Sequence, residues 1–349
     1  MSFEIPKFDL MDSNNELIIL AKMSILIFDG KNWKSILIND LKLPNSDIEN
    51  LLKPSLCEIY QTKEKKEKIF VLTGGFNLNQ KSASKTTFVL NLNNENCFLD
   101  LKFDDLNCAR FMHGSINIKN KFVLVFGGKN EKNFVVQNEI LDIEQKKWKN
   151  FPDLPKPKAN FSYCVVNENN LFLFGGFEAN GKYSENKLIK CEINVDEFEK
   201  SLWKNIILKG KNVENLPLAC AGMFPNDDNI IICGGTNGKE IVDSIFEIDT
   251  NEETVEKIGK LNQARSNCHT LMNNGNYFLI GGNMKQFKFN NNEIENYIEK
   301  FSFDLNNEII ANSINVKTEQ IFPKIKDKIN FYKNEAGFSF CASLMSKNY

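Results

Sequence analysis

Short apolar runs that end in a Gly-Gly pair recur five times along the chain. Each run is apolar at nearly every position, which is the pattern of a strand covered on both faces. From first glycine to first glycine the steps are 53, 48, 59 and 47 residues, a loose period that predicts one four-strand unit per copy. We predict that the glycines form structural turns with unusual dihedrals, at Gly74, Gly75, Gly127, Gly128, Gly175, Gly176, Gly234, Gly235, Gly281 and Gly282.

Polar turn residues divide each copy into strands. Around Gly175, the pattern predicts a first strand over 161–166, a turn over 167–170 and a second strand that ends at the Gly-Gly pair. A third strand over 187–193 and a fourth strand entered through Trp203 complete the unit. Trp148 takes the same place in the preceding copy.

An apolar run with Gly-Gly, then a spaced aromatic residue and then a Trp resembles the kelch repeat family. The resemblance covers nearly the whole chain, although only two of the Gly-Gly copies keep the Trp. It implies an all-β protein with the fold of a kelch-type β-propeller, in which each repeat is one blade.

The two ends of the chain predict a sixth blade. Residues 336–341 mirror the first strand at 159–164, and residues 16–22, 24–28 and 29–36 supply three further strands. We therefore predict a single six-bladed propeller over 1–349, closed when the C-terminal strand joins three N-terminal strands, which removes exposed sheet edges. The predicted blades are 16–38 plus 331–349, 54–103, 109–151, 159–208, 218–258 and 264–312.

The composition and the cysteine usage favour a cytosolic-type compartment. It has 349 residues, of which 42% are hydrophobic, and a net charge of -2, which gives no drive toward nucleic acid or an anionic membrane. Its nine cysteines are scattered without a Cys-x-x-Cys, which favours reduced thiols. No signal sequence or membrane span is apparent. We expect a cytoplasmic protein, with cytoskeletal or ciliary association as one setting.

Arginine and histidine are the rarest candidates for site chemistry. Arg110 and His113 occupy places in their repeat that we take as equivalent to those of Arg265 and His269, and the other 41 basic residues are lysines. One interpretation is that these residues are structural remnants of the repeat consensus. The other is that the two arginines line the mouth of the central channel and hold a carboxylate or an acidic peptide through forked donors.

Catalytic and metal chemistry find little support in the sequence. Two histidines in repeats that are not adjacent, without Cys or Asp at ligand spacing, argue against a metal site. The Gly-Gly pairs are not phosphate loops, and no Gly-x-Ser-x-Gly occurs. We expect no cofactor, no metal and no enzymatic activity.

The loops that follow the Gly-Gly pairs are the candidate binding surface. They carry aromatic residues among lysines, which is typical of protein recognition, although each aromatic could instead pack between blades. These residues are Phe76, Phe134, Phe177, Tyr183 and Phe287, with Lys81, Lys85, Lys129, Lys132, Lys182 and Lys285. The opposite face carries acidic turns at 142–144, 196–199 and 249–253.

The sequence therefore predicts a non-catalytic scaffold or adaptor that binds protein partners, as a component of a larger cytoskeletal or ciliary assembly. A substrate receptor of a ubiquitin ligase is an alternative that the resemblance permits. That role usually brings an oligomerisation domain, which six blades in 349 residues leave no room for. An enzyme that uses the central channel is a third, less favoured alternative.

Overall fold

A computed structural model describes most of the chain. The described residues are 17–21, 24–28, 33–37, 51–61, 67–91, 103–184, 187–273, 276–280, 282–284, 289–290, 293–303, 309–317 and 341–344. Among these residues the regular structure is β-strand, apart from the short 3-10 helices Ala179–Gly181, Phe198–Lys200 and Val213–Asn215. The all-β prediction is confirmed.

Three consecutive repeats each form a sheet of four antiparallel strands in chain order. Blade 3 contains β10 (Gly114–Ile118), β11 (Phe122–Phe126), β12 (Asn138–Asp142) and β13 (Lys147–Phe151). Blade 4 contains β14 (Ser162–Val166), β15 (Asn170–Phe174), β16 (Leu188–Glu192) and β17 (Leu202–Ile206). Blade 5 contains β18 (Gly222–Asn226), β19 (Asn229–Cys233), β20 (Ser244–Asp249) and β21 (Thr254–Lys260).

The repeats on either side follow the same plan with local differences. Blade 2 contains β5 (Ser55–Gln61), β6 (Glu67–Thr73) and β9 (Thr87–Asn91), and its predicted fourth strand lies mostly outside the described residues. Blade 6 contains β23 (His269–Asn273), β24 (Asn276–Ile280), β27 (Glu293–Phe303) and β28 (Ile309–Lys317), with β26 (Phe289–Asn290) added at one end. Strand β28 thus runs beyond residue 312, where we predicted that this blade ends.

A further four-stranded sheet joins the two ends of the chain. It contains β1 (Leu17–Ala21), β2 (Ser24–Phe28), β3 (Trp33–Leu37) and β29 (Cys341–Leu344) in the order β29-β1-β2-β3. Strands β29 and β1 are antiparallel, with Leu17 opposite Leu344 and Leu20 opposite Cys341.

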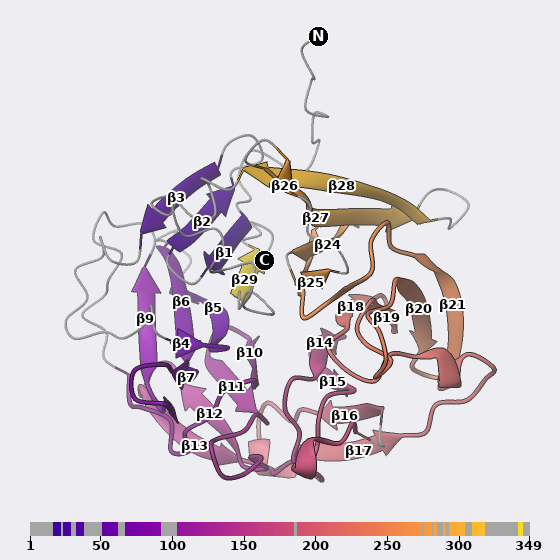
Figure 1. Cartoon of the computed structure of the whole chain (residues 1–349). Helices are drawn as coiled ribbons and strands as arrows, with labels where there is room; N and C mark the ends of the chain where they lie inside the picture. Colours follow the sequence, from indigo (N-terminus) through magenta and orange to yellow (C-terminus); the bar gives the residue numbers. More distant parts are fainter. Residues whose placement is uncertain are drawn as a thin grey trace.

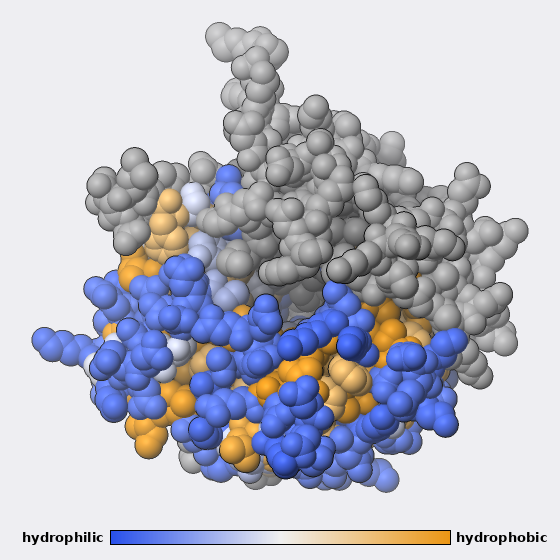
Figure 2. Space-filling model, turned by 180° about the vertical axis from the view of Figure 1, so that it is seen from behind, coloured by the Kyte–Doolittle hydropathy of each residue, from blue (hydrophilic) through white to orange (hydrophobic). Residues whose placement is uncertain are grey.

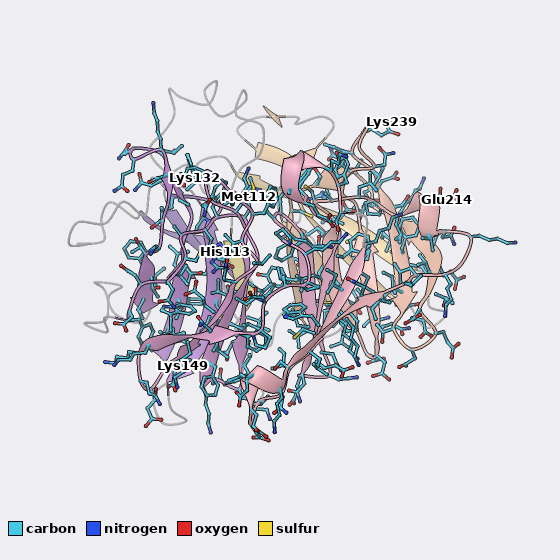
Figure 3. The ribbon with its side chains drawn as sticks, turned by 90° about the horizontal axis from the view of Figure 1, so that it is seen from below. Met112, His113, Lys132, Lys149, Glu214 and Lys239 are labelled. Atoms are coloured by element: carbon cyan, nitrogen blue, oxygen red, sulfur yellow. The ribbon has the colours of Figure 1, made fainter. Side chains whose placement is uncertain are left out.

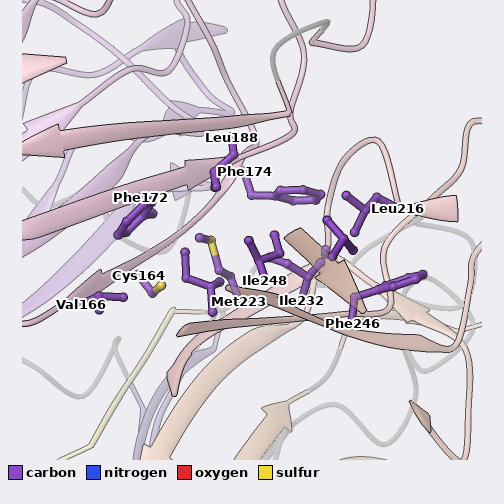
Figure 4. Close-up of a cluster of buried hydrophobic side chains, with 13 residues drawn as sticks. Cys164, Val166, Phe172, Phe174, Leu188, Leu216, Met223, Ile232, Phe246 and Ile248 are labelled. Carbon is purple, nitrogen blue, oxygen red and sulfur yellow. The ribbon is translucent and has the colours of Figure 1, made fainter. Parts of the chain in front are cut away.

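The sheets are arranged around a common centre with their first strands innermost (Figure 1). Inner strand β29 contacts β23 on one side and β5 on the other. Apolar side chains fill the space between neighbouring sheets, as in the cluster of Phe174, Met223, Ile232 and Phe246 between blades 4 and 5 (Figure 4). The molecule is therefore a propeller-like array whose core lies between the blades.

The Gly-Gly pair forms a main-chain link from each blade to the next. The N–H of Gly176 donates to the carbonyl oxygen of Leu218 at the start of blade 5, at 3.1 Å. Gly175 has a φ of +60°, and a Cβ at this position would lie 2.5 Å from the same oxygen. The first glycine therefore makes room for the carbonyl that the second glycine binds. Three other pairs make the same link, from Gly75 to Arg110, from Gly128 to Lys158 and from Gly235 to Arg265, at 2.9, 2.7 and 2.7 Å.

The remaining glycines of the five motifs fit this account. All those that the structure describes have positive φ, between 58° and 106°. Gly281 lies outside the described residues, whereas Gly282 has a φ of 90°.

Side chains make a second link between blades at a repeated position. The residue just before Gly-Gly meets the residue just before the inner strand of the next blade. Thr73 Oγ1 and His113 Nε2 lie 2.9 Å apart between blades 2 and 3. Between blades 3 and 4, the rings of Phe126 and Phe161 stack with centroids 5.8 Å apart. Polar and aromatic pairs thus occupy equivalent places in the array.

The two predicted tryptophans anchor the outer strands. Trp148 Nε1 donates to the carbonyl oxygen of Asp104 at 2.8 Å, and Trp203 Nε1 donates to that of Pro152 at 2.9 Å. In both cases the acceptor lies on the segment that enters the same blade. Each Trp therefore ties the last strand of its blade to the connection from the preceding one.

Candidate functional site

Short hairpins after the Gly-Gly pairs form one face of the molecule, which we call the loop face. In each hairpin the residue after Gly-Gly is bridged to the incoming segment of its own blade and to the returning arm of the hairpin. Lys129 is bridged in this way to Phe111 and Phe134, and Phe177 to Ala159 and Tyr183. In blade 2 the same arrangement is β4 (Leu51–Leu52), β7 (Phe76–Asn77) and β8 (Ser82–Ala83).

Four of the five predicted aromatic residues lie in these rows. Phe76, Phe134, Phe177 and Tyr183 are half-buried. The ring of Phe76 lies 5.2 Å from that of Phe111, and the ring of Phe177 lies 5.1 Å from that of Tyr183. Lys129 Nζ lies 5.2 Å and 5.9 Å from the ring centroids of Phe111 and Phe134. Phe287 and Lys285 lie outside the described residues.

The two arginines do not line the mouth of the central channel, so the interpretation that they hold an acidic peptide there is wrong. Arg110 and Arg265 are fully buried, and each is paired with a buried glutamate. Arg110 Nη2 lies 2.6 Å from Glu139 Oε1, and Arg265 Nη2 lies 3.0 Å from Glu299 Oε2. The guanidinium of Arg110 makes its hydrogen bonds inside the blade, because Nη1 also donates to the carbonyl oxygens of Gly127 and Gln137 at 3.0 and 2.8 Å. These residues hold the start of each blade against its own sheet.

Lys158 occupies the place of Arg110 in blade 4. It is fully buried, and its Nζ donates to the carbonyl oxygen of Gly175 at 3.3 Å. Burial lowers the pKa of Lys158 to about 8, and the nearby Glu178 opposes this shift. Ile189 of this blade occupies the position that Glu139 has in blade 3, as the registers of the two sheets show.

The two histidines are not equivalent. His269 lies opposite Ile280, the residue before Gly-Gly in its repeat. In blade 3 the residue opposite Phe126, which precedes Gly-Gly, is Gly114, so His113 lies one position earlier than His269. His113 is buried against Thr73, and burial and the charge of Arg110 hold its pKa well below the usual range. A neutral, buried imidazole does not contact a partner on the loop face.

A ring of residues at the centre of the loop face was missed by the sequence reasoning. Each member lies two residues before an inner strand and has a left-handed φ between 54° and 61°. The members of this inner ring are Lys53, Met112, Asn160, Cys220 and Asn267. Met112 N–H donates to the carbonyl of Lys53, Asn160 N–H to that of Met112 and Asn267 N–H to that of Cys220.

Side chains of the inner ring meet although they come from different blades. Asn267 Oδ1 lies 3.3 Å from Lys53 Nζ and 3.1 Å from Asn160 Nδ2. Asn160 Nδ2 also lies 2.9 Å from Cys220 Sγ, and burial raises the pKa of that thiol to about 11. Left-handed conformations cost energy in residues other than glycine and are often found at functional sites. All five members lie two residues before the first residue of an inner strand, such as Gly114 of β10 or Ser162 of β14. This shared position can be recognised only when the strand register is known.

The loop face and the opposite face are distinct in Figure 3. Met112, Lys132 and Lys239 lie toward one end of the blades, and Lys149 of β13 lies toward the other. The side hidden in Figure 1 is mostly hydrophilic over the described residues, with separate hydrophobic patches (Figure 2). A depression of about 410 Å³, which Lys119, Val195 and Leu202 help to line, lies at the turns of blades 3 and 4.

The possible metal ligands of the described residues are spread over the fold. Among the described residues, no group of three or more His, Cys, Asp or Glu side chains lies close enough together to hold a metal ion. Also within these residues, no helix is long and apolar enough to cross a bilayer.

The repeated Gly-Gly links and the Trp anchors agree with the family that the sequence matches. The model of the KLHDC2/KLHL20/DRC7 Kelch-repeats domain matches residues 112–309, which is more than half of the chain. This chain belongs to the kelch-repeat family. Kelch-repeat domains generally mediate protein–protein interaction.

Individual kelch proteins are similar to this chain over part of their length. Kelch repeat and BTB domain-containing protein 2 of cowpox virus (strain GRI-90) is 22% identical over 221 residues, which cover 60% of this chain and 38% of the viral protein. Kelch domain-containing protein 10 of Xenopus tropicalis is 24% identical over 203 residues, 54% of this chain and 48% of that protein. tRNA wybutosine-synthesizing protein 4 of Candida albicans is 24% identical over 210 residues, 54% of this chain and 30% of that protein. The kelch chain thus spans less than half of each of these relatives.

Proposed function

We propose that this kelch protein is a non-catalytic scaffold or adaptor that binds a protein partner on its loop face. The observation that carries the proposal is the inner ring, in which side chains from blades 2, 4, 5 and 6 meet on the same face as the half-buried aromatic residues of blades 2 to 4. A centre that offers hydrogen-bonding groups inside an apolar rim is suited to anchor one segment of a partner.

The proposed frame for this site is a closed six-bladed ring. It is supported by the pairing of β29 with β1 and by the contacts of β29 with β23 and β5. Closure would fix the inner ring, because each of its residues is hydrogen-bonded to the neighbouring blade. The predicted blade boundaries belong to this proposal.

The proposed setting is a larger cytoplasmic assembly, of the cytoskeletal or ciliary kind. A substrate receptor of a ubiquitin ligase is the second candidate, and the BTB domain in the name of the cowpox virus relative is the observation that favours it. An enzyme that uses the central channel is less favoured, since His113 is buried.

The proposal is tested by quantitative capture of partners from cell extract with three forms of the chain. The wild type is compared with the loop-face variant Met112→Glu/Tyr183→Glu and with the control Leu202→Glu, which changes an exposed residue at the opposite end of the blades. Proteins that bind the wild type and the control should be lost from the loop-face variant, with melting temperatures unchanged. Partners that are lost only from the control would place the binding surface elsewhere and overturn the proposal.

A further inference from the structure

One exposed lysine stands at the tip of the hairpin in each of four consecutive blades. Each lies between the residue that follows Gly-Gly and the returning arm, so the four tips follow the rim of the loop face from blade 2 to blade 5. These tip lysines are Lys81, Lys132, Lys182 and Lys239. Two of them, Lys132 and Lys239, appear at the same end of the blades in Figure 3.

The tips are held in place by local hydrogen bonds. Asn130 Oδ1 accepts the N–H groups of Lys132 and Asn133, at 3.0 and 2.8 Å. Asn237 Oδ1 accepts those of Lys239 and Glu240 in the same way, at 3.0 and 2.9 Å. Backbone ordering of this kind lowers the entropy that is lost when a loop binds a partner.

Two of the three acidic residues of these hairpins accept hydrogen bonds within the protein. Glu131 accepts the N–H of Ala83 from the neighbouring hairpin, and Glu178 Oε1 accepts the hydroxyl of Ser184 at 2.6 Å. By contrast, in the part of the chain that the structure describes, the tip lysines make no ion pair. Hydrogen bonds to neutral donors leave the charge of a carboxylate in place, so the rim is positive only by the excess of lysine over glutamate. The four hairpins carry five lysines (Lys81, Lys129, Lys132, Lys182 and Lys239) and three glutamates (Glu131, Glu178 and Glu240), a net charge of +2, although the whole chain carries a net charge of -2.

Aromatic side chains lie in the same hairpins as two of the tip lysines. Phe76, in the hairpin of Lys81, packs against Phe111, and Phe177 packs against Tyr183 in the hairpin of Lys182. All four rings keep part of their surface exposed. Exposed lysines and partly exposed aromatic side chains thus occur together in the hairpins of blades 2, 3 and 4.

We infer that the partner segment is an extended acidic chain with interspersed aromatic or leucine side chains, which lies along the rim from blade 2 to blade 5. Lysine ammonium groups are point charges that accept carboxylates from many directions, so they suit a flexible acidic segment better than a single fixed anion. Apolar residues of the same segment cover the aromatic rows. The inference rests on the proposed function and adds which partner chemistry the loop face selects.

The test uses isothermal titration calorimetry of the full chain with defined polymers. A random copolymer of glutamate and tyrosine is the probe, polyglutamate lacks the apolar component, and polylysine carries the opposite charge. The wild type should bind the glutamate–tyrosine copolymer more tightly than polyglutamate, and any binding of polylysine to the acidic opposite face should be the same in the wild type and in a variant of the tip lysines. Binding should weaken with added salt, because exposed charges are screened beyond about 10 Å at roughly 0.1 M.

Charge reversal with a matched control decides whether the tips are responsible. Replacing all four tip lysines by Glu should weaken copolymer binding by about tenfold or more, given the usual strength of rim charge pairs. The control replaces four exposed lysines elsewhere by Glu and so makes the same change in net charge. These control positions are Lys119, Lys121, Lys147 and Lys257.

The outcomes separate this inference from the proposed function. Equal loss of affinity in the two quadruple variants, or no binding of the copolymer to the wild type, would overturn the inference. If natural partners are lost from Met112→Glu/Tyr183→Glu but still bind the tip variant, the loop face is the binding surface. In that case the inference that an acidic segment lies along the tip lysines is wrong.

Discussion

Replacing Gly175 by Ala tests the main-chain link between blades 4 and 5. The added Cβ would have to occupy a position 2.5 Å from the carbonyl oxygen of Leu218, in a residue with a φ of +60°. The oxygen would have to move away, which weakens its hydrogen bond with Gly176 N–H, now 3.1 Å long. We expect the variant to fold with reduced stability.

The expected loss has two parts. A left-handed conformation costs an alanine about 1 to 2 kcal/mol relative to glycine. Displacing a buried carbonyl from its donor adds about 1 to 2 kcal/mol. The free energy of unfolding should therefore fall by about 2 to 4 kcal/mol, measured by urea denaturation with tryptophan fluorescence, for which Trp203 reports on the same blade.

Gly181→Ala is the matched control. Gly181 has a φ of +71°, and nothing lies within 4 Å of the position that its Cβ would take. This variant should lose only the conformational part, about 1 to 2 kcal/mol. If the two variants lose equal stability, the contact with Leu218 contributes nothing and the explanation of the Gly-Gly motif is wrong.

Three further predictions follow from the buried charges and the terminal sheet. Arg110→Met should cost about 3 kcal/mol or more in thermal or urea unfolding, because it leaves the buried Glu139 carboxylate without its cation. Arg110→Met/Glu139→Leu should recover only part of this loss, because the N–H groups of Asn107 and Cys108 lose the carboxylate as their acceptor. Since the pKa of Lys158 falls from 10.5 unfolded to about 8 folded, its contribution to stability should be complete above pH 10.5 and lost as pH falls to 8. Lys158→Met should remove that dependence, and an unchanged pH profile would contradict the assignment. Deleting residues 336–349 should abolish the cooperative melt in calorimetry, whereas a native-like melt would count against closure of the ring.

The repeat architecture was predictable because its signal is local. Apolar runs, Gly-Gly pairs and Trp residues each reflect a requirement of one strand or turn, so they appear in the sequence at their own positions. Phe177 and Tyr183 were placed on the loop face by the same reasoning, since they follow a Gly-Gly pair.

The chemistry of the arginines could not be predicted from their rarity. Arg110 is buried because Glu139 lies on another strand of its sheet, and that pairing depends on a register that the sequence does not display. The inner ring was missed for a related reason. Lys53 and Asn267 are separated by 214 positions in sequence and meet only when the blades surround a centre.

The Gly-Gly link has a consequence for how such an array can change. Its donor and acceptor are backbone groups, so any blade could be joined to any other through it. The pairs Thr73–His113 and Phe126–Phe161 differ in shape and polarity, so they distinguish one neighbour from another. An exchanged or duplicated blade would therefore still connect to its neighbours, but it would bring His113 against a phenylalanine or Phe161 against a threonine. These paired positions therefore favour one order of the repeats. A substitution at one member of a pair requires a matching substitution at the other.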